Sequence, residues 1–125
     1  MFVTDGIIQY RKNSVVAWID DGIGAYYRSL LPRAWCVKPP KEKTHVSIVR
    51  VFERPNREAW GVYDGLSICI TYYPSIQTDG IYFWLDCDSD EIGFLRRTLL
   101  LSTFRNDNPQ YKLYENYHIT IANTK

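Results

Sequence analysis

The sequence predicts one α+β domain that is built from two similar halves. Three observations predict it. The 125 residues suffice for one hydrophobic core but not for two. Short runs of β-branched and aromatic residues are followed in each half by an amphipathic stretch at helical spacing. The order of these segments in the first half recurs in the second. We therefore expect a single domain over residues 1–125.

The first half predicts two short strands, a helix and a buried strand. The helix is expected to begin after Asp21, which would cap its first turn, and to end before Pro32. A Pro- and Lys-rich stretch then leads into the buried strand, which is rich in Val and Ile. In chain order these elements are expected at residues 6–12, 14–19, 22–31 and 44–52.

The second half predicts a turn, two strands, a helix, a polar loop and a last strand. Alternating apolar residues predict the strands, and apolar residues on one face predict the helix. In chain order these elements are expected at residues 61–65, 66–73, 81–87, 89–102, 106–110 and 117–123.

Short sequence blocks echo each other between the halves. Ala17-Trp18-Ile19-Asp20 matches Phe83-Trp84-Leu85-Asp86. Each block is followed by a predicted helix with a similar central sequence, then by a loop and by a strand that contains one histidine. Coincidence among common elements is the alternative. The shared order favours an internal duplication.

The chain has two histidines, and both lie in a His-x-Ser/Thr motif within an apolar strand. Side chains alternate along a strand, so His45 and Ser47 should share one face, as should His118 and Thr120. Each strand would then present one imidazole beside one hydroxyl.

This pairing suits the cleavage of a phosphodiester. One imidazole can take the proton of an attacking hydroxyl or water while the other protonates the leaving oxygen, both near neutral pH. The hydroxyls of Ser47 and Thr120 can donate hydrogen bonds to the non-bridging phosphate oxygens. The four residues are thus the candidate catalytic residues, and this chemistry needs no metal and no cofactor.

Three other interpretations stand beside this one. Each histidine can be a hydrogen-bonded core residue with a strand-forming hydroxyl nearby. A zinc site needs three or four ligands, and two lone histidines supply too few. Nucleophilic cysteine is the third, although Cys69 and Cys87 lie in apolar strand patterns typical of packing residues.

Composition limits the partners and the location. A net charge of +1 argues against binding to long duplex nucleic acid. No apolar run is long enough to span a membrane, and the first residues lack a signal-peptide pattern. Three cysteines without metal-binding spacing suit a reducing compartment, so we expect a cytoplasmic protein that does not contact membranes. The sequence does not set the oligomeric state.

The paired motifs resemble those of the 2H phosphoesterase superfamily. Within it, the blocks Tyr26-Tyr27-Arg28-Ser29-Leu30-Leu31-Pro32, Thr44-His45-Val46-Ser47-Ile48-Val49-Arg50, Trp60-Gly61-Val62-Tyr63-Asp64-Gly65 and Tyr117-His118-Ile119-Thr120 are similar to phage anti-CBASS nucleases, which degrade cyclic oligonucleotide second messengers of bacterial defence. The resemblance implies a bilobal LigT-like fold, with two pseudo-symmetric lobes of antiparallel sheet, helices outside and a central cleft. It implies that His45 and His118 are the acid and base, that Ser47 and Thr120 bind phosphate, and that a phage-encoded protein would act in the host cytoplasm.

A nucleotide substrate needs further contacts. Tyr10 and Trp60 are candidates for stacking on bases, with core packing as the alternative. Arg50 is a candidate for holding a phosphate, with surface solvation as the alternative.

The leading hypothesis is therefore a phosphodiesterase that opens cyclic di- or trinucleotides at a 3′–5′ linkage. An RNA-end enzyme acting on a 2′,3′-cyclic phosphate of short RNA is the second hypothesis. A non-catalytic nucleotide sponge is the third.

Overall fold

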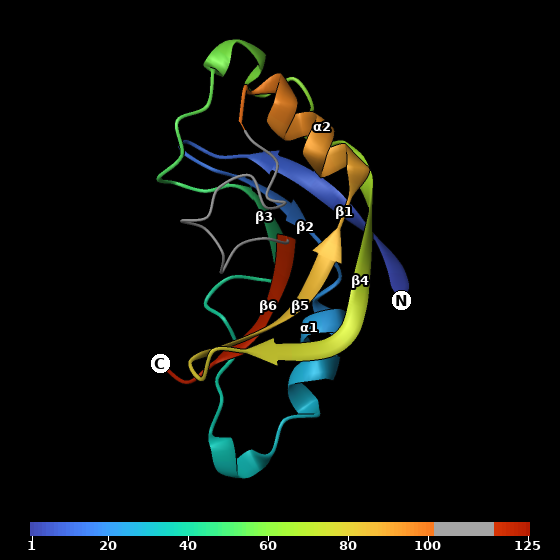
Figure 1. Cartoon of the computed structure of the whole chain (residues 1–125), viewed down its shortest axis with the longest axis vertical. Helices are drawn as coiled ribbons and strands as arrows, with labels where there is room; N and C mark the ends of the chain where they lie inside the picture. The colour runs from blue at the N-terminus through green and yellow to red at the C-terminus, as the bar shows by residue number, and fades with distance from the viewer. Residues whose placement is uncertain (102–116) are drawn as a thin grey trace.

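A computed structural model describes residues 1–101 and 117–125, and its strands form one closed antiparallel barrel (Figure 1). The order around the barrel is β1-β2-β3-β6-β5-β4. The strands are β1 (Phe2–Tyr10), β2 (Val15–Trp18), β3 (His45–Val49), β4 (Ser67–Thr78), β5 (Tyr82–Asp88) and β6 (Tyr117–Asn123). The helices are α1 (Asp21–Ser29) and α2 (Asp90–Thr98), with short 3-10 helices η1 (Arg33–Trp35) and η2 (Arg57–Ala59).

The predicted bilobal LigT-like fold with a central cleft is wrong. β1 pairs with β4 from Phe2↔Tyr72 to Ile7↔Ser67, and this ladder joins the outer strands of the two halves. A sheet closed in this way has no free edges there and encloses one interior. The chain is thus a single six-stranded barrel with two short α-helices in its described part, not two lobes around a cleft.

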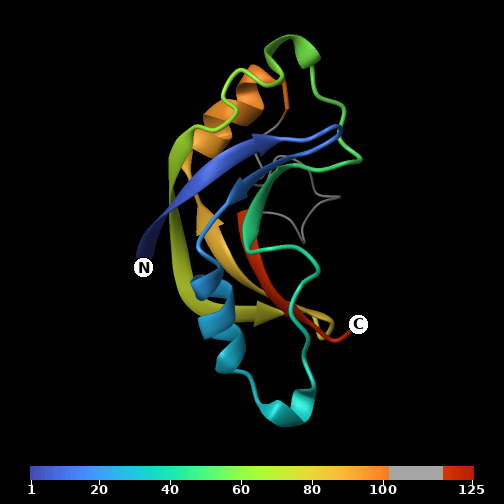
Figure 2. The same ribbon diagram turned by 180° about the vertical axis from the view of Figure 1, so that it is seen from behind.

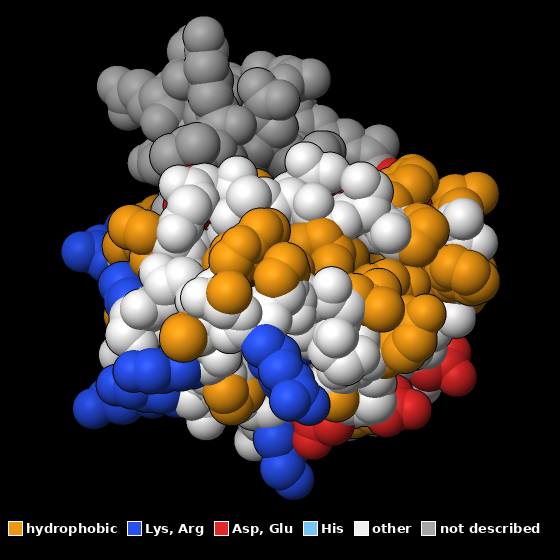
Figure 3. Space-filling view, turned by 90° about the horizontal axis from the view of Figure 1, so that it is seen from below, with side chains coloured by type: hydrophobic (Ala, Val, Ile, Leu, Met, Phe, Trp, Pro, Cys, Tyr) orange, Lys and Arg blue, Asp and Glu red, His pale blue; other side chains and the backbone are white. Residues whose placement is uncertain are grey.

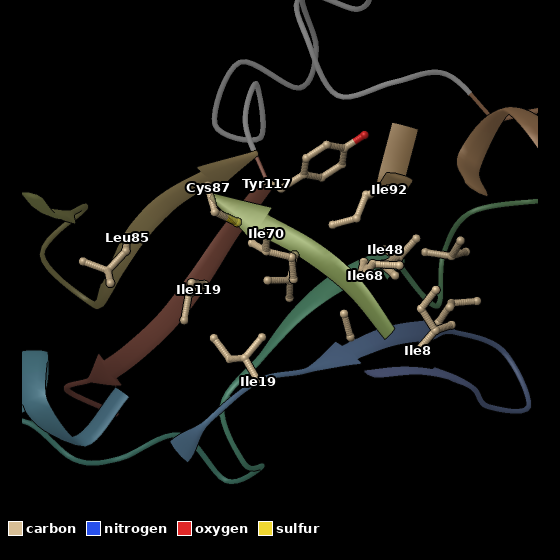
Figure 4. Close-up of a cluster of buried hydrophobic side chains, with 14 of the residues drawn as sticks. Ile8, Ile19, Ile48, Ile68, Ile70, Leu85, Cys87, Ile92, Tyr117 and Ile119 are labelled. Carbon is tan, nitrogen blue, oxygen red and sulfur yellow. The ribbon is translucent and has the colours of Figure 1, made fainter. Parts of the chain in front are cut away.

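Apolar side chains fill the interior because each strand alternates between an inward and an outward face. Figure 4 shows isoleucines from β1, β3, β4 and β6 in one buried cluster with Leu85 and Cys87 of β5. Ile48, Ile70, Leu85 and Ile119 are fully buried. The interior is tightly packed at Gly6 of β1, where an added Cβ would lie 2.7 Å from the Cδ1 atom of Ile70 on the neighbouring strand β4.

The two helices lie at opposite ends of the long axis, as both views show (Figures 1 and 2). Asp20 caps α1 by accepting a hydrogen bond from the Gly22 N–H at 2.8 Å, so the cap lies one residue before the predicted Asp21. Ser89 caps α2 through the Ile92 N–H at 3.4 Å. Each helix packs on a strand of the other half: α1 on β6 and α2 on β3.

The predicted elements of the described residues exist, with shifted ends. The predicted strand 44–52 stops at Val49, because Arg50 to Glu53 form a turn in which the Glu53 N–H donates to the Arg50 carbonyl at 3.0 Å. β4 continues to Thr78, beyond the predicted end at residue 73. The turn at residues 61–65 is confirmed, with Gly61 and Gly65 at positive φ. The predicted polar loop at 106–110 lies outside the described residues.

The order of elements repeats as the sequence blocks do. A hairpin, an α-helix and a strand follow one another as β1-β2-α1-β3 and again as β4-β5-α2-β6. In the barrel, the last strands of the two halves, β3 and β6, are neighbours. β2 flanks β3 on its other side, and β5 flanks β6. The two strands that contain the histidine motifs therefore lie side by side.

The surface at the α1 end mixes apolar and charged side chains (Figure 3). Hydrophobic side chains gather in the middle and on one side of this face, and lysine and arginine gather on the other side. Tyr26, Leu30 and Trp35 are among the exposed hydrophobic residues of α1 and the segment after it. No helix in the described part of the chain is long and apolar enough to cross a membrane.

Candidate functional site

The two histidine motifs lie next to each other on adjacent antiparallel strands. Val46 of β3 is paired with Ile119 of β6. One residue to either side of this pair, antiparallel register places His45 across from Thr120 and Ser47 across from His118. Each imidazole therefore lies across from the hydroxyl of the other motif.

All four motif side chains point away from the interior. Val46 and Ile119 are fully buried in the core, so their neighbours along each strand occupy the outer face. His45, Ser47, His118 and Thr120 are half-buried, which leaves part of each side chain open to solvent.

The flanking strands extend the cluster into two rows across four strands. β2 pairs Trp18 with His45, and β5 pairs Trp84 with Thr120. The first row is therefore Trp18, His45, Thr120 and Trp84. The second row follows from the pairs of Val16 with Ser47 and of Asp86 with His118, and consists of Val16, Ser47, His118 and Asp86.

His45 has a defined tautomer when it is neutral. Its Nδ1 lies 2.7 Å from the Lys43 carbonyl oxygen, which only accepts hydrogen bonds, so Nδ1 carries the hydrogen. Nε2 is then the unprotonated nitrogen and can take a proton. The ring packs edge-on to Trp18, with a centroid distance of 5.4 Å. Glu42 Oε2 lies 3.7 Å from Nε2.

His118 has different neighbours. Asp86 is its cross-strand partner on β5, and the ring centroid of Trp84 lies 6.2 Å from that of His118. Asp86 Oδ1 also accepts a hydrogen bond from Trp84 Nε1 at 3.2 Å.

Matching arginines hold the strands just beyond the two motifs. Arg28 of α1 donates to the carbonyl of Ile121 at 2.9 Å, and Arg96 of α2 donates to the carbonyl of Ile48 at 2.7 Å. Ile48 follows Ser47 and Ile121 follows Thr120 in the chain. α1 thus holds β6, which carries Thr120, and α2 holds β3, which carries Ser47.

The start of β3 is fixed by α1 as well. Asp21 Oδ1 accepts a hydrogen bond from the Thr44 N–H at 2.8 Å, and this bond lowers the pKa of the Asp21 carboxyl below its usual value. Asp21 is therefore charged at neutral pH. Its contact orients the residue before His45.

The predicted base-stacking residues pack against each other. The rings of Tyr10 and Trp60 meet edge-on with a centroid distance of 5.4 Å, and the Arg57 guanidinium lies 4.1 Å from the Trp60 ring centroid. Both rings pack on the core, and burial raises the pKa of Tyr10. Arg50 lies beyond the end of β3, with its guanidinium 6.0 Å from the Phe52 ring centroid.

The other reactive groups that the sequence offered, metal ligands and cysteine thiols, do not form a site in the described residues. Within 1–101 and 117–125, no group of three His, Cys, Asp or Glu side chains is arranged to hold a metal. The cysteines are free thiols: Cys87 is buried in the core, which raises its pKa, whereas Cys36 and Cys69 are exposed. The packing interpretation of Cys69 is therefore wrong.

A hollow of about 270 Å³ lies elsewhere, where β4 and β5 meet the start of α2. Two of its polar side chains already make hydrogen bonds within the fold. Glu91 accepts from the Cys69 N–H at 2.7 Å, and the Ser89 hydroxyl donates to the Cys69 carbonyl at 2.8 Å. The histidine motifs do not line it.

Comparisons of this chain with protein-family models, curated proteins and solved structures found no match.

Sequence reasoning missed the residues that surround the motifs. Trp18, Trp84 and Asp86 stood out in the internal echo, but only the register between strands places them beside the histidines. Arg11 and Glu42 gave no signal, because they are 31 positions apart in the chain, with β2 and α1 between them.

Proposed function

We propose that this protein is a metal-independent phosphodiesterase that cleaves a phosphodiester beside a ribose 2′-hydroxyl. The observation that supports it most directly is the pairing of Val46 with Ile119, which aligns the two His-x-Ser/Thr motifs on one outer face. His45 and His118 are diagonal neighbours in this register, and such neighbours are typically about 7–8 Å apart, with their Cβ atoms somewhat closer. One phosphate fits between two imidazoles at this spacing.

The two histidines take different roles in the proposed reaction. His45 Nε2 accepts the proton of the 2′-hydroxyl, whose oxygen attacks phosphorus. The P–O5′ bond breaks, and the leaving 5′-oxygen takes a proton from the imidazolium of His118. The tautomer of neutral His45, which leaves Nε2 able to take a proton, supports its role as base. With His45 as the base, we assign the acid to His118.

The hydroxyls complete the site. Ser47 lies across from His118 and Thr120 across from His45, so the phosphate between the imidazoles has a hydroxyl donor near each one. Their hydrogen bonds stabilise the negative charge that develops on the non-bridging oxygens.

The substrate class that we propose is a cyclic di- or trinucleotide with 3′–5′ linkages, as the resemblance to nucleases that counter bacterial CBASS defence suggests. Trp18 and Trp84 at the two ends of the first row support a nucleotide with a base on either side of the phosphate, since indole faces stack on bases. The choice of cyclic oligonucleotides rests on the resemblance of the sequence motifs, whereas the proposed cleavage chemistry rests on their geometry in the barrel.

Product analysis tests the proposed function. Purified protein is incubated in EDTA with cyclic dinucleotides, with their 2′-deoxy analogues and with RNA ending in a 2′,3′-cyclic phosphate. Products are then separated and weighed by mass spectrometry. We expect a linear 2′,3′-cyclic phosphate from the ribose-containing rings, no reaction of the deoxy rings, and a rate about 10²- to 10⁴-fold lower for His45→Ala or His118→Ala.

Two other results would redirect the assignment. Turnover of the RNA ends alone would assign the site to RNA-end processing. Recovery of intact rings from heat-denatured protein, without turnover of any substrate, would assign it to nucleotide sequestration and contradict the catalytic role.

A further inference from the structure

A carboxylate already occupies an anion position beside the proposed base. Glu42, in the loop before β3, accepts a hydrogen bond from Arg11 Nη1 through Oε1 at 2.9 Å, and its Oε2 lies 3.7 Å from His45 Nε2. The carboxylate therefore lies between the Arg11 guanidinium and the His45 imidazole, with which it forms an ion pair when that ring is protonated. A phosphate has the same charge sign and the same preference for these two partners.

Glu42 is charged and only loosely held. The hydrogen bond from Arg11 lowers the pKa of its carboxyl, so it is ionised at neutral pH. Its side chain is 46% exposed, against 31% for Arg11 and 21% for His45. Exposed ion pairs contribute little to stability, so displacing this carboxylate costs little.

Arg11 has a second support that does not involve Glu42. Its guanidinium carbon lies 5.0 Å from the centroid of the Trp18 ring, and Trp18 Nε1 in turn donates to Gln9 Oε1 at 2.6 Å. Arg11 would therefore keep its place beside the first row after Glu42 has moved away.

We propose that Glu42 is a resident anion that the substrate phosphate displaces, and that Arg11 then binds that phosphate beside His45. This inference rests on the proposed function, because it identifies the anion as the phosphodiester that reacts. It adds Arg11 as a phosphate-binding residue and Glu42 as a competing internal ligand.

Titration with inorganic phosphate tests the inference without any cleavage. The chain has two histidines, so their imidazole NMR signals can be assigned with the His45→Ala and His118→Ala proteins. The dissociation constant from the His45 signal is then compared between wild type, Glu42→Gln, Arg11→Ala and the double variant. Asp5→Asn, which removes one exposed carboxylate on β1, is the matched charge control.

Glu42→Gln should bind phosphate about two- to fivefold more tightly, since it removes a weak competing ion pair. Arg11→Ala should bind about tenfold more weakly, since it removes a charged donor. In the Arg11→Ala protein, Glu42→Gln should tighten phosphate binding by a smaller factor than it does in the wild-type protein. Asp5→Asn should have the phosphate affinity of wild type.

Two results would overturn the inference: an unchanged or weaker affinity in Glu42→Gln, or an equal gain in Asp5→Asn. The outcome is separable from that of the proposed function. A protein that cleaves no nucleotide but shows this binding pattern refutes the catalysis alone. A protein that cleaves cyclic dinucleotides but has the same phosphate affinity before and after Glu42→Gln refutes the displacement alone.

Discussion

At the scale of residues, equivalent positions of the two halves have different neighbours. Asp20 and Asp86 close matching sequence blocks, yet Asp20 caps α1 while Asp86 lies across from His118. Trp18 lies across from His45, whereas Trp84 lies across from Thr120, two positions further along. A register shift between Phe83 and Trp84 accompanies this difference. The two histidines thus have different neighbours.

The leaving group of the substrate should separate the two histidines. A 4-nitrophenyl ester of uridine 3′-phosphate has 4-nitrophenolate as its leaving group, which is stable without a proton. Loss of the general acid, His118, should therefore slow its cleavage little. We expect His118→Ala to cost less than about tenfold on this ester, and His45→Ala to keep its full loss of about 10²- to 10⁴-fold. Initial rates of nitrophenol release measure both. Equal losses in the two variants would contradict the assigned roles.

At the scale of elements, a buried ion pair holds α2 against β3. Arg96 of α2 is 1% exposed and binds Glu53 through two hydrogen bonds, at 3.0 and 2.6 Å, besides its bond to the Ile48 carbonyl. Glu53 also accepts from the Arg50 N–H at 3.0 Å, which fixes the turn after β3. This network orients the end of the strand that carries Ser47.

Arg96→Met should lower the free energy of unfolding by about 3–5 kcal/mol, because it leaves the carboxylate of Glu53 without its buried partner. Arg28→Met, which removes the equivalent bond to Ile121 without a buried ion pair, should cost about 1 kcal/mol. Urea unfolding followed by tryptophan fluorescence measures both. Arg97→Met, on the exposed side of α2, is the control. Equal losses for Arg96 and Arg97 would contradict the role of the pair.

The sequence predicted elements better than their contacts. Local periodicity placed the strand at residues 117–123 at its observed bounds and identified both α-helices. That β3 and β6 are neighbours, so that the two histidine motifs lie side by side, is shown by the strand pairing and did not follow from the motifs or the internal echo. The cap of α1 was shifted by one residue, because Asp20 and Asp21 are both capping types and only the structure shows that Asp21 binds Thr44.

At the scale of the whole molecule, the barrel depends on a contact that no local pattern reveals. The ladder between β1 and β4 joins residues about sixty or more positions apart in the chain. Alternation along each strand predicts a buried face but not the partner strand. The sequence was therefore consistent with two open sheets as well as with one closed barrel, and the resemblance favoured the wrong one.

Closure of the barrel predicts a coupling between Gly6 and Ile70. Gly6→Val would crowd the Ile70 Cδ1 atom and should cost about 1–3 kcal/mol of unfolding free energy. Ile70→Val removes that atom and should cost about 0.5–1.5 kcal/mol alone. In the double variant the loss should be clearly smaller than the sum, as urea unfolding will show. Strict additivity would mean that β1 and β4 do not meet here.

The central claim is that the two histidine motifs form one catalytic site, and a double-variant cycle tests it most directly. Opening of a cyclic dinucleotide in EDTA is timed for wild type, His45→Ala, His118→Ala and the double variant, with circular dichroism as the check on folding. We predict that the double variant is about as inactive as either single one, because residues that act as a unit lose their effect together. Losses that multiply in the double variant, or a folded single variant at the wild-type rate, would contradict the claim.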